Sequence, residues 1–193
     1  MNRYFKKIVA AVLTIVFCFT CSACAADFDD EKREKNGDKI TQEQELIPVS
    51  DLPAYSDSFL LVMEHVNVDA ARVDEFVGYL IAAYDTYDAE HFCQFAYEQF
   101  ELEFFSSMID AVSSEATKLE NMKTADGFRA ALALRNFNVQ LSSANLSYAG
   151  CNTDYAEAQL DADAADYERL KESYAFSINL YCELFYGEEL LNN

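Results

Sequence analysis

The chain contains only two histidines, His65 and His91, so chemistry that needs an imidazole would depend on these two side chains. Residues 88–91 read Asp-Ala-Glu-His, which would place Asp88 and His91 on one face of a helix. Di-iron helical bundles use a Glu-x-x-His spacing on two of their helices, but this sequence has one approximate copy with Asp instead of Glu. A surface polar pair of His91 with Glu98, one heptad later, explains the histidine more simply. We therefore predict no metal site and no cofactor.

The usual catalytic sequence patterns are missing. The sequence contains no Gly-x-Ser-x-Gly elbow, no Walker loop, no dinucleotide-binding glycine pattern and no His-Glu-x-x-His. No serine stands in a recognisable arrangement with a histidine and an acid. We expect that the protein is not an enzyme.

Charge excludes two classes of partner. The net charge is −20, and all 34 acidic residues lie after position 26. Such a field repels nucleic acid and anionic lipid headgroups, so we exclude both as main partners. Acidity on this scale keeps a domain soluble and dispersed. An acidic bundle that collects metal cations is the alternative interpretation.

The first 23 residues have the three parts of a secretory signal peptide. Residues 1–7 are short and basic, residues 8–20 are almost unbroken apolar sequence, and small residues follow. The apolar part is shorter than the ~20 residues that a permanent membrane-spanning helix needs. We expect the leader to direct export and then to be removed.

Ser22 and Ala23 precede Cys24, and this pattern resembles the lipobox of bacterial lipoprotein precursors. The resemblance covers the first 24 residues and implies that Cys24 receives a diacylglycerol thioether and becomes the mature N-terminus. The sequence departs from the family at Cys21, where Leu is usual. Cleavage after residues 23–25, which read Ala-Cys-Ala, would instead release a soluble secreted protein. We expect an extracytoplasmic protein that is lipid-anchored to a bacterial membrane, with the free form as the alternative.

Residues 24–55 are expected to form a flexible linker. Their central part is charged in both signs and almost lacks large apolar residues before Leu46. Such a segment cannot bury enough surface to offset the entropy of ordering. The part from residue 25 to residue 50, about 26 residues of flexible chain, spans roughly 25–30 Å on average.

Heptad-spaced apolar rows predict an all-α domain over residues 56–190. We expect helices over 57–87, 89–121, 124–148 and 154–187, capped at their starts by Ser56 or Asp57, by Thr124 or Asp126, and by Thr153 or Asp154. Gly150 and Gly187 are expected to end the last two helices. The core rows include Leu132, Val139 and Leu146 of the third helix and Tyr167, Tyr174 and Tyr181 of the fourth.

Four helices joined by short loops predict an antiparallel, up-down-up-down four-helix bundle. The junction at residues 85–88 contains no Gly or Pro, so one continuous helix over 57–121 stays open as an alternative. We prefer the break, because half of the apolar stripe of a continuous helix would lack a partner. Arg135, close to the apolar row of the third helix, is expected to pair with an acid on a neighbouring helix.

This topology groups the remaining cysteines. It places Cys93 and Cys151 at the same end of the bundle and Cys182 about 45 Å away. Any disulfide is therefore predicted to join Cys93 to Cys151, which an exported compartment permits. Three reduced cysteines that pack as small apolar residues are the alternative.

The same end of the bundle, far from the linker, is the predicted partner surface. Tyrosines combine apolar area with a polar handle, as binding surfaces favour. Aromatic side chains that merely cap the core are the alternative. The residues gathered there are Tyr84, Tyr87, His91, Phe92, Tyr148, Asn152 and Tyr155. We thus expect a membrane-anchored binding or scaffold domain whose partner is an envelope protein. The sequence does not specify the oligomeric state.

Overall fold

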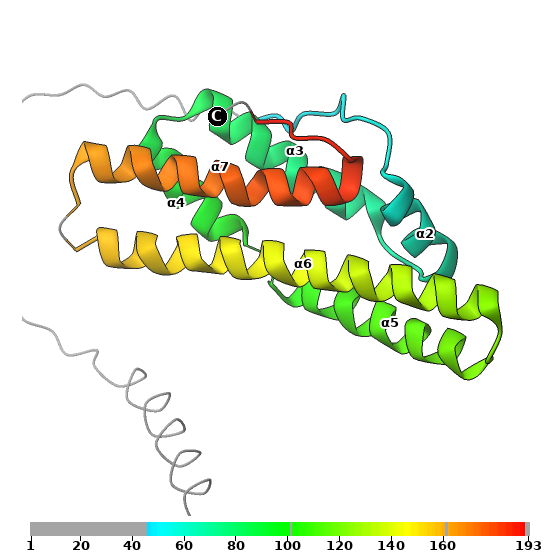
Figure 1. Ribbon diagram of the computed structural model, residues 1–193. Coiled ribbons are helices and arrows are strands. Elements are labelled where there is room, and N and C mark those ends of the chain that lie inside the picture. The colour runs from blue at the N-terminus through cyan, green and yellow to red at the C-terminus, as the bar shows by residue number, and fades with distance from the viewer. Residues whose placement is uncertain (1–45, 101, 161, 192–193) are drawn as a thin grey trace, which may run out of the picture. The chain divides into compact units, whose positions relative to one another are not determined.

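The computed structural model describes residues 46–100, 102–160 and 162–191, and among these residues all regular structure is helical. The prediction of an all-α domain is confirmed. In this part of the chain six helices follow one another where four were expected (Figure 1). They are α2 (Asp57–His65), α3 (Ala70–Thr86), α4 (Ala89–Gln99), α5 (Leu102–Asn121), α6 (Ala125–Ala158) and α7 (Ala164–Tyr186).

Side-chain caps set the helix starts. Ser56 caps α2 by accepting the Phe59 N–H, and Thr124 caps α6 by accepting the Gly127 N–H. Each bond satisfies one of the backbone donors that the first turn of a helix leaves free. Both caps lie where the sequence placed them. Asp163, which sequence reasoning passed over, caps α7 in a reciprocal capping box with Asp166.

The helix expected over 57–87 is interrupted at residues 66–69. Val66 has an extended backbone, and Asp69 starts α3 by accepting the Arg72 N–H. The β-branched residues Val66 and Val68 are poor helix formers, and Asp69 competes for the backbone as a cap. A continuous helix is therefore wrong here, although the apolar heptad rows run through the break.

The helix expected over 89–121 is also divided, at Phe100, whose backbone is extended. The interruption releases the carbonyl of Ala96 from its position in the helical ladder. The hydroxyl of Tyr148 donates to that carbonyl at 2.7 Å. A buried tyrosine from another helix thus satisfies the end of α4, which explains why a break without Gly or Pro is tolerated.

Helix α6 continues through Gly150, where a stop was predicted. Tyr148, Cys151 and Tyr155 are all buried and recur at helical spacing on both sides of the glycine. Burial of this face outweighs the ~1 kcal/mol that Gly costs inside a helix. The turn to the last helix consequently lies after Ala158, and Cys151 lies on α6 rather than in a loop.

The C-terminal end follows its prediction. Gly187 caps α7 in the left-handed conformation with φ of 81°, which a residue without Cβ adopts readily. The chain then reverses, and the buried Asn179 side chain holds it: Nδ2 donates to the Leu191 carbonyl, and Oδ1 accepts the N–H groups of Leu190 and Leu191.

The folded domain begins before residue 56. Residues 46–56 run without helix along the domain, and Leu46, Val49, Leu52 and Tyr55 pack against the core. The Val49 N–H donates to the Gly78 carbonyl of α3, and the Ser56 N–H donates to the Phe185 carbonyl of α7. The predicted flexible linker over 24–55 is therefore too long at its C-terminal end. Its residues 24–45 lie outside the described part of the chain.

Helix α6 forms the centre of the packing. Figure 1 shows α5 antiparallel along its first half and α7 antiparallel along its second half. Aromatic rings fill the interior, for example Phe105 stacked 5.1 Å from Tyr181. The row Leu132, Val139 and Leu146, predicted to be core, is exposed instead. No described helix is long and apolar enough to cross a membrane.

Candidate functional site

The structure distributes the seven residues of the predicted partner surface between core and surface. Phe92, Tyr148 and Tyr155 are buried, so their side chains serve the core. Those that remain accessible are His91, which is exposed, and Tyr84, Tyr87 and Asn152, which are half-buried. A partner at this end of the molecule would therefore contact the junction of α3 and α4.

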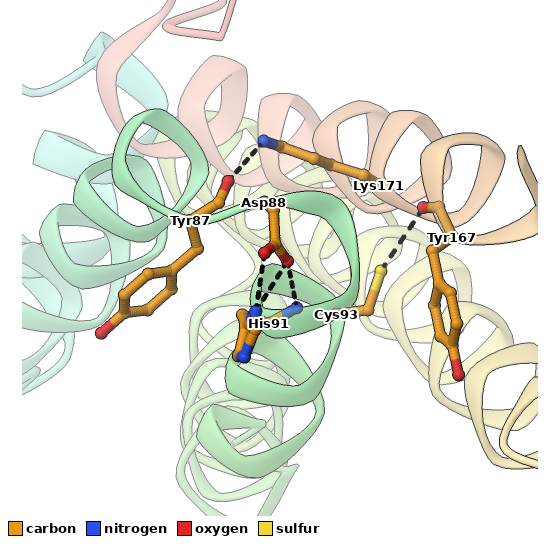
Figure 2. A network of polar contacts seen from close by, with 6 residues as sticks. All are labelled: Tyr87, Asp88, His91, Cys93, Tyr167 and Lys171. Carbon is orange, nitrogen blue, oxygen red and sulfur yellow. Dashed lines mark hydrogen bonds and ion pairs between the residues drawn. The ribbon is translucent and has the colours of Figure 1, made fainter. Parts of the chain in front are cut away.

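Asp88 is the residue that shapes this junction. It caps α4 by accepting the His91 N–H at 2.9 Å, and its two carboxylate oxygens lie 2.8 Å from His91 Nδ1 (Figure 2). The backbone N–H of His91, and secondly its side chain, hold the pKa of the Asp88 carboxyl below its usual value. His91 thus pairs with Asp88 rather than with Glu98, as part of a helix cap.

Lys171 joins the junction to α7. Its Nζ donates to the Tyr87 carbonyl at 3.0 Å, at the C-terminal end of α3, where the helix dipole favours a cation (Figure 2). The same ammonium lies 4.6 Å from the ring centre of Tyr84 and 5.5 Å from that of Phe92. The rings of Tyr84 and Phe92 therefore already contact a cation of the chain itself, and this contact gives both rings a structural role.

Cys93 and Cys151 are both buried free thiols. Cys93 Sγ donates to the Tyr167 carbonyl at 3.7 Å, and Cys151 Sγ lies 3.5 Å from the Ser177 hydroxyl. Burial, and then the electrostatic repulsion that a Cys151 thiolate would exert, raise the pKa of Cys93 to about 12. Such thiols are protonated at neutral pH and poor nucleophiles. Their predicted disulfide stays a prediction, which peptide mapping without reductant would decide.

The other predicted sites lie elsewhere. Cys182 is a third buried free thiol, on α7. Cys24, the predicted lipidation site, lies outside the described residues. Arg135 forms the predicted interhelical ion pair, with Nε 2.6 Å from an oxygen of Glu120 on α5. Because both side chains of this pair are substantially exposed, it orients α5 against α6 rather than binding a ligand.

Sequence reasoning missed a polar row inside the bundle. Asn138, Asn145 and Asn152 of α6 are spaced by seven residues, and that spacing was the available signal. The Tyr181 hydroxyl donates to Asn145 Oδ1 at 2.8 Å, and the Tyr174 hydroxyl donates to Asn152 Oδ1 at 2.6 Å. Tyr174 and Tyr181 of the α7 row thus pack in the core, as predicted, whereas Tyr167 is half-buried. Asn145 and Asn152 supply the acceptors that these hydroxyls require, while Asn138 donates to the Ile109 carbonyl.

A second missed cluster surrounds Asp74 on α3. The hydroxyls of Tyr55 and Tyr186 donate to its two carboxylate oxygens at 2.6 and 2.8 Å. Burial, followed by this bond, raises the pKa of Tyr55 to about 12. The carboxylate lines an open cavity of about 400 Å³ between α3 and residues 48–55. Both of its oxygens are already bonded, so the cluster ties the N-terminal segment to the domain.

Within the described residues, no three His, Cys, Asp or Glu side chains are grouped so that they could hold a metal ion. Comparison of the chain with protein-family models, with curated proteins and with solved structures gave no match.

Proposed function

We propose that this protein is an extracytoplasmic lipoprotein, anchored through Cys24, whose helical domain serves as a binding or scaffold module for another envelope protein. The observation that carries the proposal is the order of a basic segment, a short apolar segment and Ser22-Ala23 before Cys24. Several acyl chains on one residue anchor stably, because each buried methylene contributes ~0.8 kcal/mol.

The form of the domain supports a scaffold role. We infer a four-helix arrangement in which α2 continued by α3, and α4 continued by α5, take the places of two long helices beside α6 and α7. The buried groups at the α3–α4 junction already have partners within the domain, in the helix cap, in the cation–π contacts of Lys171 and in the core. The accessible groups of this junction, Tyr84, Tyr87 and His91, supply the amphipathic contact area of a recognition surface, and Asn152 of α6 is also accessible at this end.

The anchor is tested by Cys24→Ser. The variant should move from the detergent phase to the aqueous phase on phase separation, because it lacks the sulfur that carries the lipid. The matched control is Cys21→Ser, which should partition as the wild type does. If the Cys24→Ser variant stays in the detergent phase, the anchor is wrong.

The binding surface is tested separately at the α3–α4 junction. His91→Ala and Tyr87→Ala should leave thermal stability nearly unchanged and reduce crosslinking to a neighbouring envelope protein in intact cells. Ser114→Ala, an exposed change on α5, is the control. Unaltered crosslinking in both junction variants would exclude this surface.

A further inference from the structure

Helix α6 carries an apolar face that no part of the described chain covers. Four of its large apolar side chains are at least half exposed: Phe128 by 52%, Leu132 by 71%, Val139 by 64% and Leu146 by 75%. On a helix these positions form one stripe. Phe176 of the antiparallel α7 is also 56% exposed. Contiguous exposed apolar surface on a soluble domain is typical of an interaction site.

The middle of this face carries little charge. Residues 136–153 of α6 include no Asp, Glu, Lys or Arg, although the whole chain carries a net charge of −20. Arg129 and Arg135 lie nearer the start of the helix, and Glu183 of α7 lines the groove beside Val139. Two copies of so acidic a protein repel each other over most of their surface. They can approach more closely where charge is sparse, and the middle of this face provides such a surface on each copy.

We propose that the outward face of α6 binds α6 of a second copy of this chain, antiparallel and across a two-fold axis at Val139. The spacing of the stripe is symmetric about this residue. Leu132 and Leu146 lie seven positions on either side of it, and Phe128 and Gly150 lie eleven positions on either side. A two-fold interface requires this self-complementarity, since each residue meets its symmetric counterpart.

In this arrangement Leu132 packs against Leu146 of the second copy, and Phe128 lies over its Gly150. Apart from the adjoining residues and backbone of α6 itself, a Cβ added to Gly150 would meet no atom within 4 Å. The space beside Gly150 is therefore open, and in this arrangement it receives the phenyl ring. Close packing within the chain does not explain this glycine, whereas approach by a second helix does.

The ends of α6 favour the antiparallel direction. Lys123 precedes the first turn of α6, in which Asp126 is paired with Arg129, and Asp154 and Glu157 lie near its last turn, where the dipole is negative. Antiparallel pairing brings the acidic end of one copy to the basic end of the other. Parallel pairing would place like charges together.

The size of the face is adequate. Phe128 to Gly150 spans about 33 Å at 1.5 Å per residue, and two neighbouring helices are roughly 20 Å wide. The projected area is then about 650 Å² per copy, near the ~800 Å² that stable interfaces bury on each partner. A groove of about 240 Å³ beside Val139, lined in part by Leu180 and Leu184 of α7, accommodates side chains at the axis.

The test uses the full-length chain in the membranes of the producing cells. Val139→Cys should yield a disulfide-linked homodimer when a mild oxidant removes two electrons and two protons from the facing thiols. Ser114→Cys, on the exposed side of α5, should yield little, and so should the wild type. The inference does not depend on lipidation, because a chain released by Cys24→Ser should crosslink in the same way at equal local concentration.

The register is tested with Leu132→Cys and Leu146→Cys. The antiparallel arrangement predicts strong crosslinking when both changes are in one chain and weak crosslinking of either alone. Adding Val139→Asp should reduce that crosslink at least tenfold, because two carboxylates would face each other. Leu160→Asp, an exposed change away from the stripe, should not. The proposal is overturned if the Val139→Cys variant, with its new thiol open to labelling, gives no homodimer or crosslinks to a different polypeptide. It is also overturned if Leu146→Cys alone crosslinks as well as the pair does.

Discussion

The two faces of α6 each depart from the usual distribution of polar and apolar residues. Its inward face, which is otherwise mainly apolar, buries Asn138 and Asn145, while its outward face exposes Leu132, Val139 and Leu146. Both sets repeat every seven residues. The difference teaches that a heptad row identifies a helix face, whereas its burial depends on what the neighbouring helices present.

The inward face carries Asn145 among its apolar residues because α7 brings a tyrosine hydroxyl into the core. Tyr148, Tyr174 and Tyr181 are fully buried, and each donates a hydrogen bond to a named acceptor. An unpaired buried hydroxyl would cost about 1–3 kcal/mol, so an aromatic core rich in tyrosine needs acceptors inside it. The outward face has no such demand and carries residues suited to a partner.

Tyr148→Ala should give the largest loss. The ring is fully buried and stacks 4.9 Å from Phe100, and its hydroxyl bonds the end of α4. Loss of a buried aromatic side chain costs about 3–5 kcal/mol, and denaturant unfolding would measure it. The control, Tyr97→Ala on the exposed side of α4, should cost less than about 1 kcal/mol. Equal losses would contradict the assignment of Tyr148 to the core.

The buried thiols of Cys93 and Cys182 should react only slowly with maleimide in the folded protein. Burial raises the pKa of Cys93 and of Cys182 to about 12, compared with ~8.5 in an unfolded chain. At pH 8 this difference lowers the thiolate fraction about a thousandfold, and maleimide labelling of the native protein should slow by at least that factor. Denaturant should restore labelling. Prompt labelling of the native thiols would show that the interior opens.

The raised pKa of these two thiols also makes the stability of the domain depend on pH. The folded pKa is above the unfolded one, so the contribution of the neutral thiols is complete below about pH 8.5 and is lost as pH rises towards 12. A fall in melting temperature over that range is expected. A variant with Cys93→Ala and Cys182→Ala should show a smaller fall.

Adjacent residues on α6 provide the most direct comparison. Asn145→Ala should destabilise the domain by about 1–3 kcal/mol, because the Tyr181 hydroxyl would lose its acceptor in the core. Leu146→Ala, one position later on the exposed face, should change stability by about 0.5 kcal/mol or less. Chemical unfolding of dilute protein would measure both. A larger loss from the leucine would invert the assignment of the two faces.

A double variant refines this test. In Asn145→Leu with Tyr181→Phe, both polar partners are replaced by apolar side chains, so the penalty of an unpaired group disappears. The double variant should be more stable than Asn145→Leu alone. Additive losses would show that the hydrogen bond itself contributes little.

The sequence predicts where helices are capped better than it predicts where a helix is interrupted. Ser56, Thr124 and Gly187 act as the caps that their residue types indicate. The break at Phe100 could not be foreseen. It leaves the Ala96 carbonyl without its helical partner, and the group that satisfies this carbonyl is the hydroxyl of Tyr148, 52 residues away in the sequence. Gly150 gave the opposite error: a helix end was predicted there, but α6 continues because the residues on both sides of Gly150 are buried. Of the candidate site, residue types were predictable, but burial of Phe92, Tyr148 and Tyr155 required the tertiary contacts.

Two glycines give the finest test of the inward and outward faces. Both Gly78 and Gly150 lie inside helices, so replacement by Ala should by itself favour folding by about 0.5–1 kcal/mol. At Gly78, however, the new Cβ would lie 2.5 Å from the Val49 carbonyl oxygen and displace residues 46–55. Gly78→Ala should therefore lower the melting temperature.

Gly150→Ala should raise the melting temperature, because nothing in its own chain opposes the added methyl group. If Phe128 of a second copy fills the space above this glycine, the same change should also weaken the homodimer crosslink at Val139→Cys. Stability and association would then move in opposite directions after one methyl substitution, an outcome that damage to the fold cannot produce. A more stable chain with undiminished crosslinking would mean that Phe128 does not pack on Gly150.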